Sequence, residues 1–208
     1  MIKLTKGPEP EILKNNKHRW TLELLAAVAE EDMGRINLVT KRYNHIQVKN
    51  ALKDETHQKC AYCEAKVTDV SHGDIEHIVP KSLNKEKTFE WENLTFSCQV
   101  CNQNKSNEED ILDPYVAEPN DHLFFAGAFV KGRSEQGSRT VLQLKLNRPA
   151  LIESRNHEIG RYAEQLEKIF LIDDERVKEL LLLNILEELN SGKPEFIAAC
   201  RLVVEQYR

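Results

Sequence analysis

Residues 60–107 read CAYCEAKVTDVSHGDIEHIVPKSLNKEKTFEWENLTFSCQVCNQNKSN, and the rest of the chain is organised around them. The segment is rich in polar and turn-forming residues and has little apolar periodicity. It therefore needs a cross-link, such as a bound metal ion, to hold its shape. Two Cys-x-x-Cys pairs, Cys60/Cys63 and Cys98/Cys101, frame it. Two such pairs let four thiolates surround one ion, which predicts a structural zinc site without an open coordination position. A redox Cys-x-x-Cys is the alternative, but it would lack a βαβ context and leave the second pair unexplained.

The composition of the whole chain indicates a folded, water-exposed protein. Its 208 residues are 40% hydrophobic and 30% charged, which excludes collagen-like, low-complexity and mostly disordered chains. The longest aliphatic run, residues 180–183, is far shorter than a membrane span. The first residues have no secretory apolar region. We therefore expect a cytoplasmic protein with no membrane partner.

Charge is distributed unevenly along the chain. Residues 34–66 and 131–161 each carry seven basic and three acidic residues, whereas residues 67–130 carry twelve acidic and four basic residues. Solvated helix and strand faces are the simpler interpretation of the basic segments. Alternatively, they guide a phosphate backbone towards cations bound in the acidic middle. The net charge of −5 argues against tight nucleic-acid binding by this chain alone.

Outside the cysteine-framed segment, the pattern predicts mostly helices and an α+β fold. We expect an extended start over residues 1–17, then helices over 20–31 (ended by Gly34) and 44–58. Residues 122–130 and 140–146 are predicted to be two strands of a hairpin. Three helices should follow over 149–171, 173–190 and 194–207, with Cys200 and Tyr207 on the apolar stripe of the last. The predicted domains are a helical lead (1–58), a zinc-stapled finger (59–112), and a hairpin with a helical platform (113–208).

The helix predicted over residues 173–190 is apolar on nearly every side. A helix of this kind must be buried on several sides. The two flanking helices can cover it, or part of its surface can dock a partner protein.

Between the cysteine pairs lie side chains suited to phosphodiester hydrolysis. Glu76 offers a hard oxygen ligand, and the adjacent His77 is readily neutral near pH 7. Asn102 follows the second cysteine pair, and one carboxylate with one amide oxygen leaves coordination positions for phosphate and water. A nearby imidazole can take the proton of an attacking water. Taken singly, His77 is more simply a buried strand histidine, and Asn93 and Asn102 a turn residue and a helix cap.

The order Cys-x-x-Cys, Glu-His-Ile-Val-Pro, Glu-Asn-Leu and Cys-x-x-Cys-Asn-x-x-Lys resembles the HNH, or ββα-metal, nucleases with a zinc-stapled finger. The resemblance covers residues 60–107 and implies two antiparallel strands, a helix and a catalytic Mg²⁺ or Mn²⁺ ion. It implies that His77 is the general base and that Glu76 and Asn102 are ligands of the catalytic ion. This sequence has Glu76 where the family more often has Asp, which leaves Asp74 as a second ligand.

Two further roles follow from the same resemblance. Asn93 stands where the family's middle Asn holds the loop that orients the base. Lys105 stands where a helix lysine approaches the scissile phosphate.

A wider pattern resembles a narrower group. CAYCE at 60–64, ILDP at 111–114 and TVLQLKLNRPALIESR at 140–155 are similar to the PtuB family of Septu-type and retron-associated antiphage systems. That resemblance implies an effector nuclease assembled with an ABC-type ATPase of the PtuA family. DNA is the favoured substrate, and RNA, including tRNA, is also open because metal-activated water needs no 2′-hydroxyl. A non-catalytic zinc-finger binding module and a purely structural assembly subunit are the alternatives.

Overall fold

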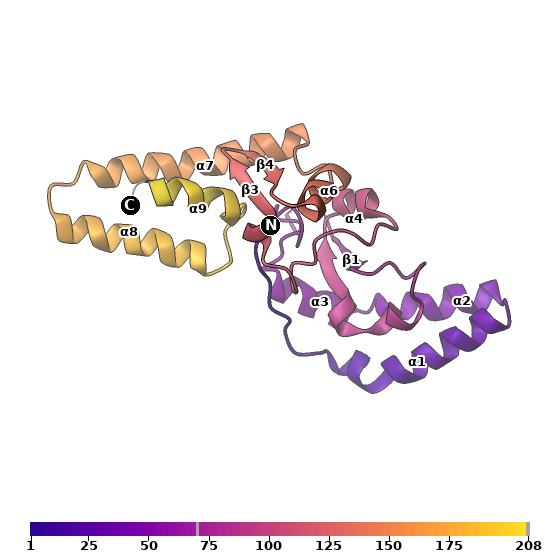
Figure 1. The fold of residues 1–208 in the computed structure, drawn as a ribbon. Coiled ribbons are helices and arrows are strands. Elements are labelled where there is room, and N and C mark those ends of the chain that lie inside the picture. Colours follow the sequence, from indigo (N-terminus) through magenta and orange to yellow (C-terminus); the bar gives the residue numbers. More distant parts are fainter. Residues whose placement is uncertain (70, 207–208) are drawn as a thin grey trace.

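The computed structural model describes residues 1–69 and 71–206, and it confirms the α+β class. Figure 1 shows the N-terminal helices on one side of the molecule and the C-terminal helices on the other, with the strands between them. Among the described residues, no helix is long and apolar enough to cross a bilayer. The N-terminal part comprises α1 (Glu11–Ala29), α2 (Met33–Thr40), a 3₁₀ turn η1 (Lys41–Tyr43) and α3 (Ile46–Glu55).

The first predicted helix is present, but its predicted start and its predicted stop signal are wrong. Helix α1 begins at Glu11, nine residues before the predicted start, because Pro10 stands at the N-cap, where a proline does not interrupt the helix. Leu13 and Trp20 then bury the same face of this longer helix. Gly34 is not a stop signal: it lies inside α2, whose N-cap Asp32 accepts a hydrogen bond from the backbone N–H of Arg35.

A ββα unit follows. Strand β1 (Asp74–His77) pairs antiparallel with β2 (Leu94–Ser97), and Glu76 lies opposite Thr95. Helix α4 (Gln99–Lys105) begins directly after β2, with Cys98 as its N-cap. Two 3₁₀ turns, η2 (Glu86–Phe89) and η3 (Trp91–Asn93), lie in the connection between the strands.

The second hairpin is present, but its predicted strands are wrong. Residues 122–130 do not form one strand. They contain β3 (Leu123–Ala126) and the start of β4 (Phe129–Gly132), which pair across a turn where Gly127 has φ +59°. A short helix α5 (Pro119–His122) precedes them. The tight turn needs a residue that tolerates positive φ, and Gly127 supplies it.

The predicted strand over residues 140–146 is instead the second half of helix α6 (Glu135–Gln143) and the turn after it. The N-cap Ser134 accepts a hydrogen bond from the Gly137 N–H. Thr140, Val141 and Leu144 are buried at helical spacing, whereas Leu142 is exposed. The alternation of apolar residues therefore indicated a strand although the buried positions follow a helical period.

The C-terminal platform is formed by α7 (Pro149–Phe170), α8 (Glu175–Asn190) and α9 (Ile197–Gln206). The predicted helices are confirmed, with α9 beginning three residues later than expected. Asp174 caps α8 through the Arg176 and Val177 N–H groups. Cys200 is a fully buried core thiol, as expected, while Tyr207 lies outside the described residues.

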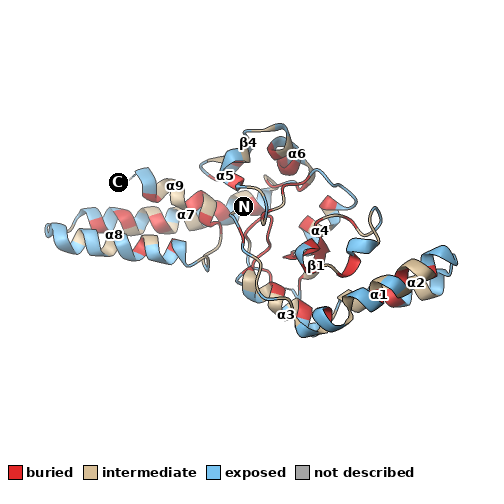
Figure 2. Cartoon of the chain, turned by 60° about the horizontal axis from the view of Figure 1, so that its bottom comes forward, coloured by how far each residue is buried: buried red, intermediate tan, exposed pale blue. Residues whose placement is uncertain are grey.

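The expectation that α8 is buried on several sides is wrong for this chain. Of its residues only Ile185 and Leu189 are buried, and Val177, Leu180 and Leu183 are exposed. The physical reason is geometric, because α8 packs on α7 and α9 along one side only. Figure 2 shows α8 largely exposed along its length.

Candidate active site and zinc centre

The four paired cysteines meet in space. The Sγ atoms of Cys60, Cys63, Cys98 and Cys101 all lie within 4.8 Å of one another, and the Cys63 and Cys98 sulfurs are 3.9 Å apart. A tetrahedral zinc ion with Zn–S bonds of about 2.3 Å has sulfur–sulfur edges of roughly 3.8 Å. Hydrogen bonds from the other three cysteines lower the pKa of Cys98, whereas burial raises that of Cys60. The donor set and its spacing fit a structural zinc ion.

His77, the last residue of β1, is held in one orientation. Its Nε2 lies 3.0 Å from the backbone carbonyl oxygen of Thr88. A carbonyl only accepts hydrogen bonds, so Nε2 carries the ring proton and Nδ1 is the basic nitrogen. The ring of Tyr43 packs against the imidazole edge-on, with 4.5 Å between ring centroids. Burial, reinforced by the charge of Lys81, lowers the pKa of His77 to about 4, so the side chain is neutral at pH 7.

Asn93 fastens the loop that carries the Thr88 carbonyl. Its Oδ1 accepts a 2.7 Å hydrogen bond from the Val79 N–H, and its Nδ2 donates to the carbonyls of Val79 and Lys87, both at 3.0 Å. These bonds join both ends of the segment between Val79 and Thr88. The loop around His77 therefore has a fixed shape without a hydrophobic core of its own.

Glu76 and Lys105 form a buried ion pair beneath the strand. Lys105 Nζ lies 3.0 Å from Glu76 Oε1 and donates to the His77 carbonyl at 2.9 Å. The lysine side chain is 1% exposed and that of the glutamate 8%. Burial raises the pKa of Glu76, and the Lys105 charge opposes that shift. The Lys105 ammonium is thus engaged by protein oxygens and is not presented to solvent.

Asp74 and Asn102 meet on the same face of the ββα unit. Asn102 Nδ2 donates to Asp74 Oδ2 at 2.9 Å, which leaves the Asn102 amide oxygen available. Two of the buried hydroxyls that have no hydrogen-bond partner among the described residues are that of Ser97, opposite Asp74 in the register, and that of Tyr62. Burial and then the charge of Glu76 raise the pKa of Tyr62. Hard oxygen donors beside unpaired buried hydroxyls fit a hydrated divalent cation.

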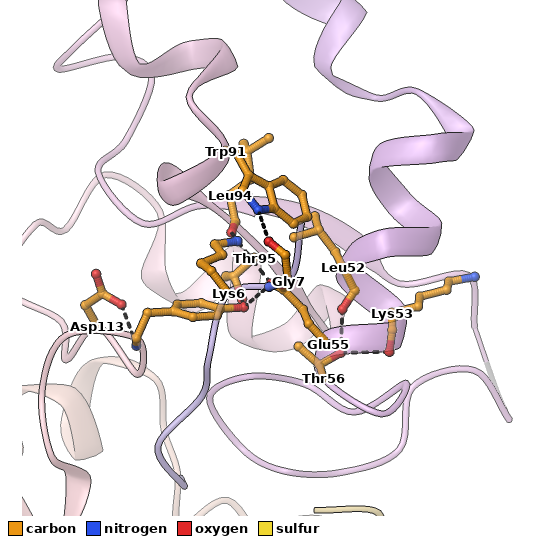
Figure 3. Close-up of polar contacts among 11 residues, drawn as sticks. Lys6, Gly7, Leu52, Lys53, Glu55, Thr56, Trp91, Leu94, Thr95 and Asp113 are labelled. Atoms are coloured by element: carbon orange, nitrogen blue, oxygen red, sulfur yellow. Dashed lines mark hydrogen bonds and ion pairs between the residues drawn. The ribbon is translucent and has the colours of Figure 1, made fainter. Parts of the chain in front are cut away.

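A polar network supports β2 from the N-terminal side. Lys6 Nζ donates to the Leu94 carbonyl and pairs with Glu55, and Trp91 Nε1 donates to the Gly7 carbonyl at 2.8 Å. Figure 3 shows Lys6 and Gly7 together with their partners Leu94, Glu55 and Trp91. Because Leu94 is the register partner of His77, the N-terminal segment helps to hold the strand that faces the histidine.

The sequence did not reveal how the arginines of the two basic segments are used. Arg35 pairs with Glu30, and Arg42 with Glu23, so part of the charge expected to guide phosphate is neutralised within the protein. Arg148 donates to the sulfurs of Cys98 and Cys101. Its place in the 140–155 motif was the only available signal, and that motif did not indicate which groups the arginine contacts.

Comparison with known proteins agrees with the geometry. Residues 60–108 match the HNH endonuclease family. The chain is 34% identical to Septu protein PtuB of Bacillus thuringiensis, over 71% of this chain and 55% of that relative. It is 28% identical to Septu protein PtuB of Bacillus mycoides (strain KBAB4), over 88% of this chain and 74% of that relative. The chain thus spans little more than half of the first relative. It carries an HNH endonuclease domain and is homologous to Septu protein PtuB.

Proposed function

We propose that this chain is a metal-dependent HNH endonuclease that hydrolyses phosphodiester bonds. The observation that carries the proposal is the arrangement of His77. Its Nε2 is bound by the Thr88 carbonyl, its Nδ1 is left basic, and it stands at the end of a strand that also carries Asp74 and Glu76. A general base needs a fixed tautomer and a neutral resting state, and this histidine has both.

In the proposed reaction, His77 Nδ1 takes a proton from a water molecule that attacks the phosphorus in line with the leaving 3′ oxygen. The Thr88 carbonyl keeps the imidazole oriented and stabilises the imidazolium that forms. Asn93 acts through Thr88 by fixing the loop between them. Lys105 acts by holding the carboxylate of Glu76 and the backbone of His77 in place, a positioning role in place of the phosphate contact expected from the sequence.

The residues that would hold the catalytic ion are Glu76, Asn102 and Asp74. When bound, Mg²⁺ or Mn²⁺ would supply positive charge to stabilise the phosphate and the leaving oxygen. The zinc on the four cysteines would have a purely structural role, because four thiolates fill its coordination shell.

We also propose that the enzyme is the effector nuclease of a Septu-type antiphage complex with an ABC-type ATPase of the PtuA family. DNA is the favoured substrate, and RNA, including tRNA, is the alternative. The homology to PtuB and the exposed leucines of α8 support a partner protein. Charged substitutions at Leu180 and Leu183 should abolish co-purification with the ATPase, whereas substitution of the exposed Leu22 on α1 should not. Undiminished recovery of the complex would contradict docking through α8.

The test of catalysis compares the wild-type chain with His77→Ala, with and without the ATPase, on plasmid, single-stranded DNA and total RNA. Cleavage should require Mg²⁺ or Mn²⁺, and His77→Ala should lower the rate by about 10²–10⁴-fold. Its zinc content should remain at the wild-type level. Cleavage by the variant at more than about a tenth of the wild-type rate would remove His77 as the base. Metal-independent nucleic-acid binding without cleavage would favour the zinc-finger binding module.

A further inference from the structure

The segment LNRPALIESR, residues 146–155, joins three parts of the molecule at the start of α7. The side chain of Asn147 binds both backbone groups of Val130 in β4, accepting from its N–H at 2.9 Å and donating to its carbonyl at 2.7 Å. Arg155, 2% exposed, donates to the Ala128 carbonyl at 3.1 Å. Pro149 begins the helix. Asn147 and Arg155 therefore fix the second hairpin to α7, and Arg148 lies between them in the chain.

Arg148 points to the cysteine cluster instead of the hairpin. Its Nη2 lies 3.7 Å from Cys101 Sγ and 3.8 Å from Cys98 Sγ, and its Nη1 lies 3.7 Å from Cys101 Sγ. Nη1 also donates to the Leu144 carbonyl at 3.3 Å, which keeps the guanidinium in place. No carboxylate forms an ion pair with Arg148 in the described part of the chain, so the sulfurs are its only anionic partners there.

The charges of the two groups are complementary. Four thiolates around Zn²⁺ leave a net charge of −2 on a largely buried centre. A guanidinium beside two of the sulfurs offsets part of that charge, and its N–H groups draw electron density from the lone pairs that a proton or an electrophile would attack. Outer-shell donors of this kind typically alter metal affinity by roughly 10–100-fold.

We propose that Arg148 is a hydrogen-bond donor to the sulfur ligands of the zinc centre. Through this contact the start of α7 determines how tightly the finger retains its zinc. Cys98 and Cys101 also begin α4, the helix that carries Asn102 and Lys105. The C-terminal platform is thereby coupled to the candidate catalytic face through the metal. The proposal depends on the zinc assignment and is independent of nuclease activity.

The experiment compares zinc-loaded wild-type protein with Arg148→Gln, Arg148→Lys and two controls. Arg139→Gln removes an arginine that pairs with Asp110 and Glu135 and contacts no sulfur. Asn147→Ala cuts the adjacent contact with β4 and leaves the guanidinium intact. Zinc transfer to a colorimetric chelator and thiol alkylation are followed at pH 7.5, well below the melting temperature of each variant. Cobalt-substituted protein gives a second readout, the thiolate-to-cobalt charge-transfer band.

Arg148→Gln should release zinc about 10–100-fold faster than wild type and shift the cobalt band, because the sulfurs lose their donors. Arg148→Lys keeps the positive charge but lacks the planar set of N–H donors of the guanidinium. Its rate of zinc release should therefore lie between those of wild type and Arg148→Gln. Both controls should remain within about twofold of wild type. Equal rates of zinc release from Asn147→Ala and Arg148→Gln would mean that a weakened contact between the second hairpin and the start of α7 is the cause. That result would overturn the proposal. Wild-type zinc release and an unmoved cobalt band in Arg148→Gln would also overturn it. Wild-type protein that binds no zinc would refute the metal assignment itself.

Discussion

Replacing Lys105 by Met should destabilise the protein more than almost any other single change on α4. The substitution keeps an unbranched side chain one atom shorter but leaves the carboxylate of Glu76 buried without its cation, 3.0 Å from where the ammonium lay. Removing one partner of a buried ion pair costs about 3–5 kcal/mol. The His77 carbonyl loses a charged donor at the same time. We therefore expect a loss of about 3 kcal/mol or more in the free energy of unfolding.

The assay is urea unfolding of zinc-loaded protein at pH 7.5 for wild type, Glu76→Gln, Lys105→Met and the double variant. The double variant should be about 2 kcal/mol more stable than Lys105→Met, because it no longer buries an unpaired charge. If Lys105 served only to contact the substrate phosphate, Lys105→Met would unfold within about 1 kcal/mol of wild type while cleavage fell. That result, together with additive single changes, would refute the reasoning.

Three further predictions concern the general base His77, the zinc ligand Cys60 and the turn at Gly73. The neutral state of His77 should stabilise the fold fully above pH 6.5, and this contribution should disappear as the pH falls towards about 4. Between pH 7.5 and 5, wild type should thus lose about 2 kcal/mol more than His77→Gln in urea unfolding, and equal losses would contradict the buried pKa. Cys60→Ser should lose most of its zinc by metal analysis and unfold the finger, whereas full zinc occupancy would exclude the four-cysteine site. Gly73→Ala should cost about 2 kcal/mol or more in thermal unfolding, because φ is +62° and a Cβ would lie 2.3 Å from Phe96; Gly160→Ala, with open space, should cost nothing. A stable Gly73→Ala would show that the turn adapts.

Local chemistry was readable from the sequence wherever one short segment contains all of its causes. The cysteine spacing predicted the cluster because two thiolates separated by two residues can reach one ion without help from the rest of the fold. The ββα unit was implied by the resemblance of residues 60–107 to the HNH nucleases. Pro149 marked the start of its helix, because the first helical position needs no N–H donor and a proline fits it.

Other elements required the tertiary structure, because the groups that decide them lie far apart in the chain. Thr140 and Leu144 alternate with neighbours as in a strand, yet they are helical because one helix face is buried in the folded chain. The leucines of α8 suggest burial all round, but only their contacts with α7 and α9 determine which side is covered.

The candidate site divides in the same way. The sequence by itself identified the chemical groups, namely four thiolates, a histidine, carboxylates and amides. The environments of these groups came from the fold, because hydrogen bonds and charges act through space and not along the chain. His77 is neutral and oriented because Thr88 lies at its Nε2. Lys105 is drawn to Glu76 across the ββα unit, and Arg148 reaches sulfurs 47 and 50 residues away in sequence.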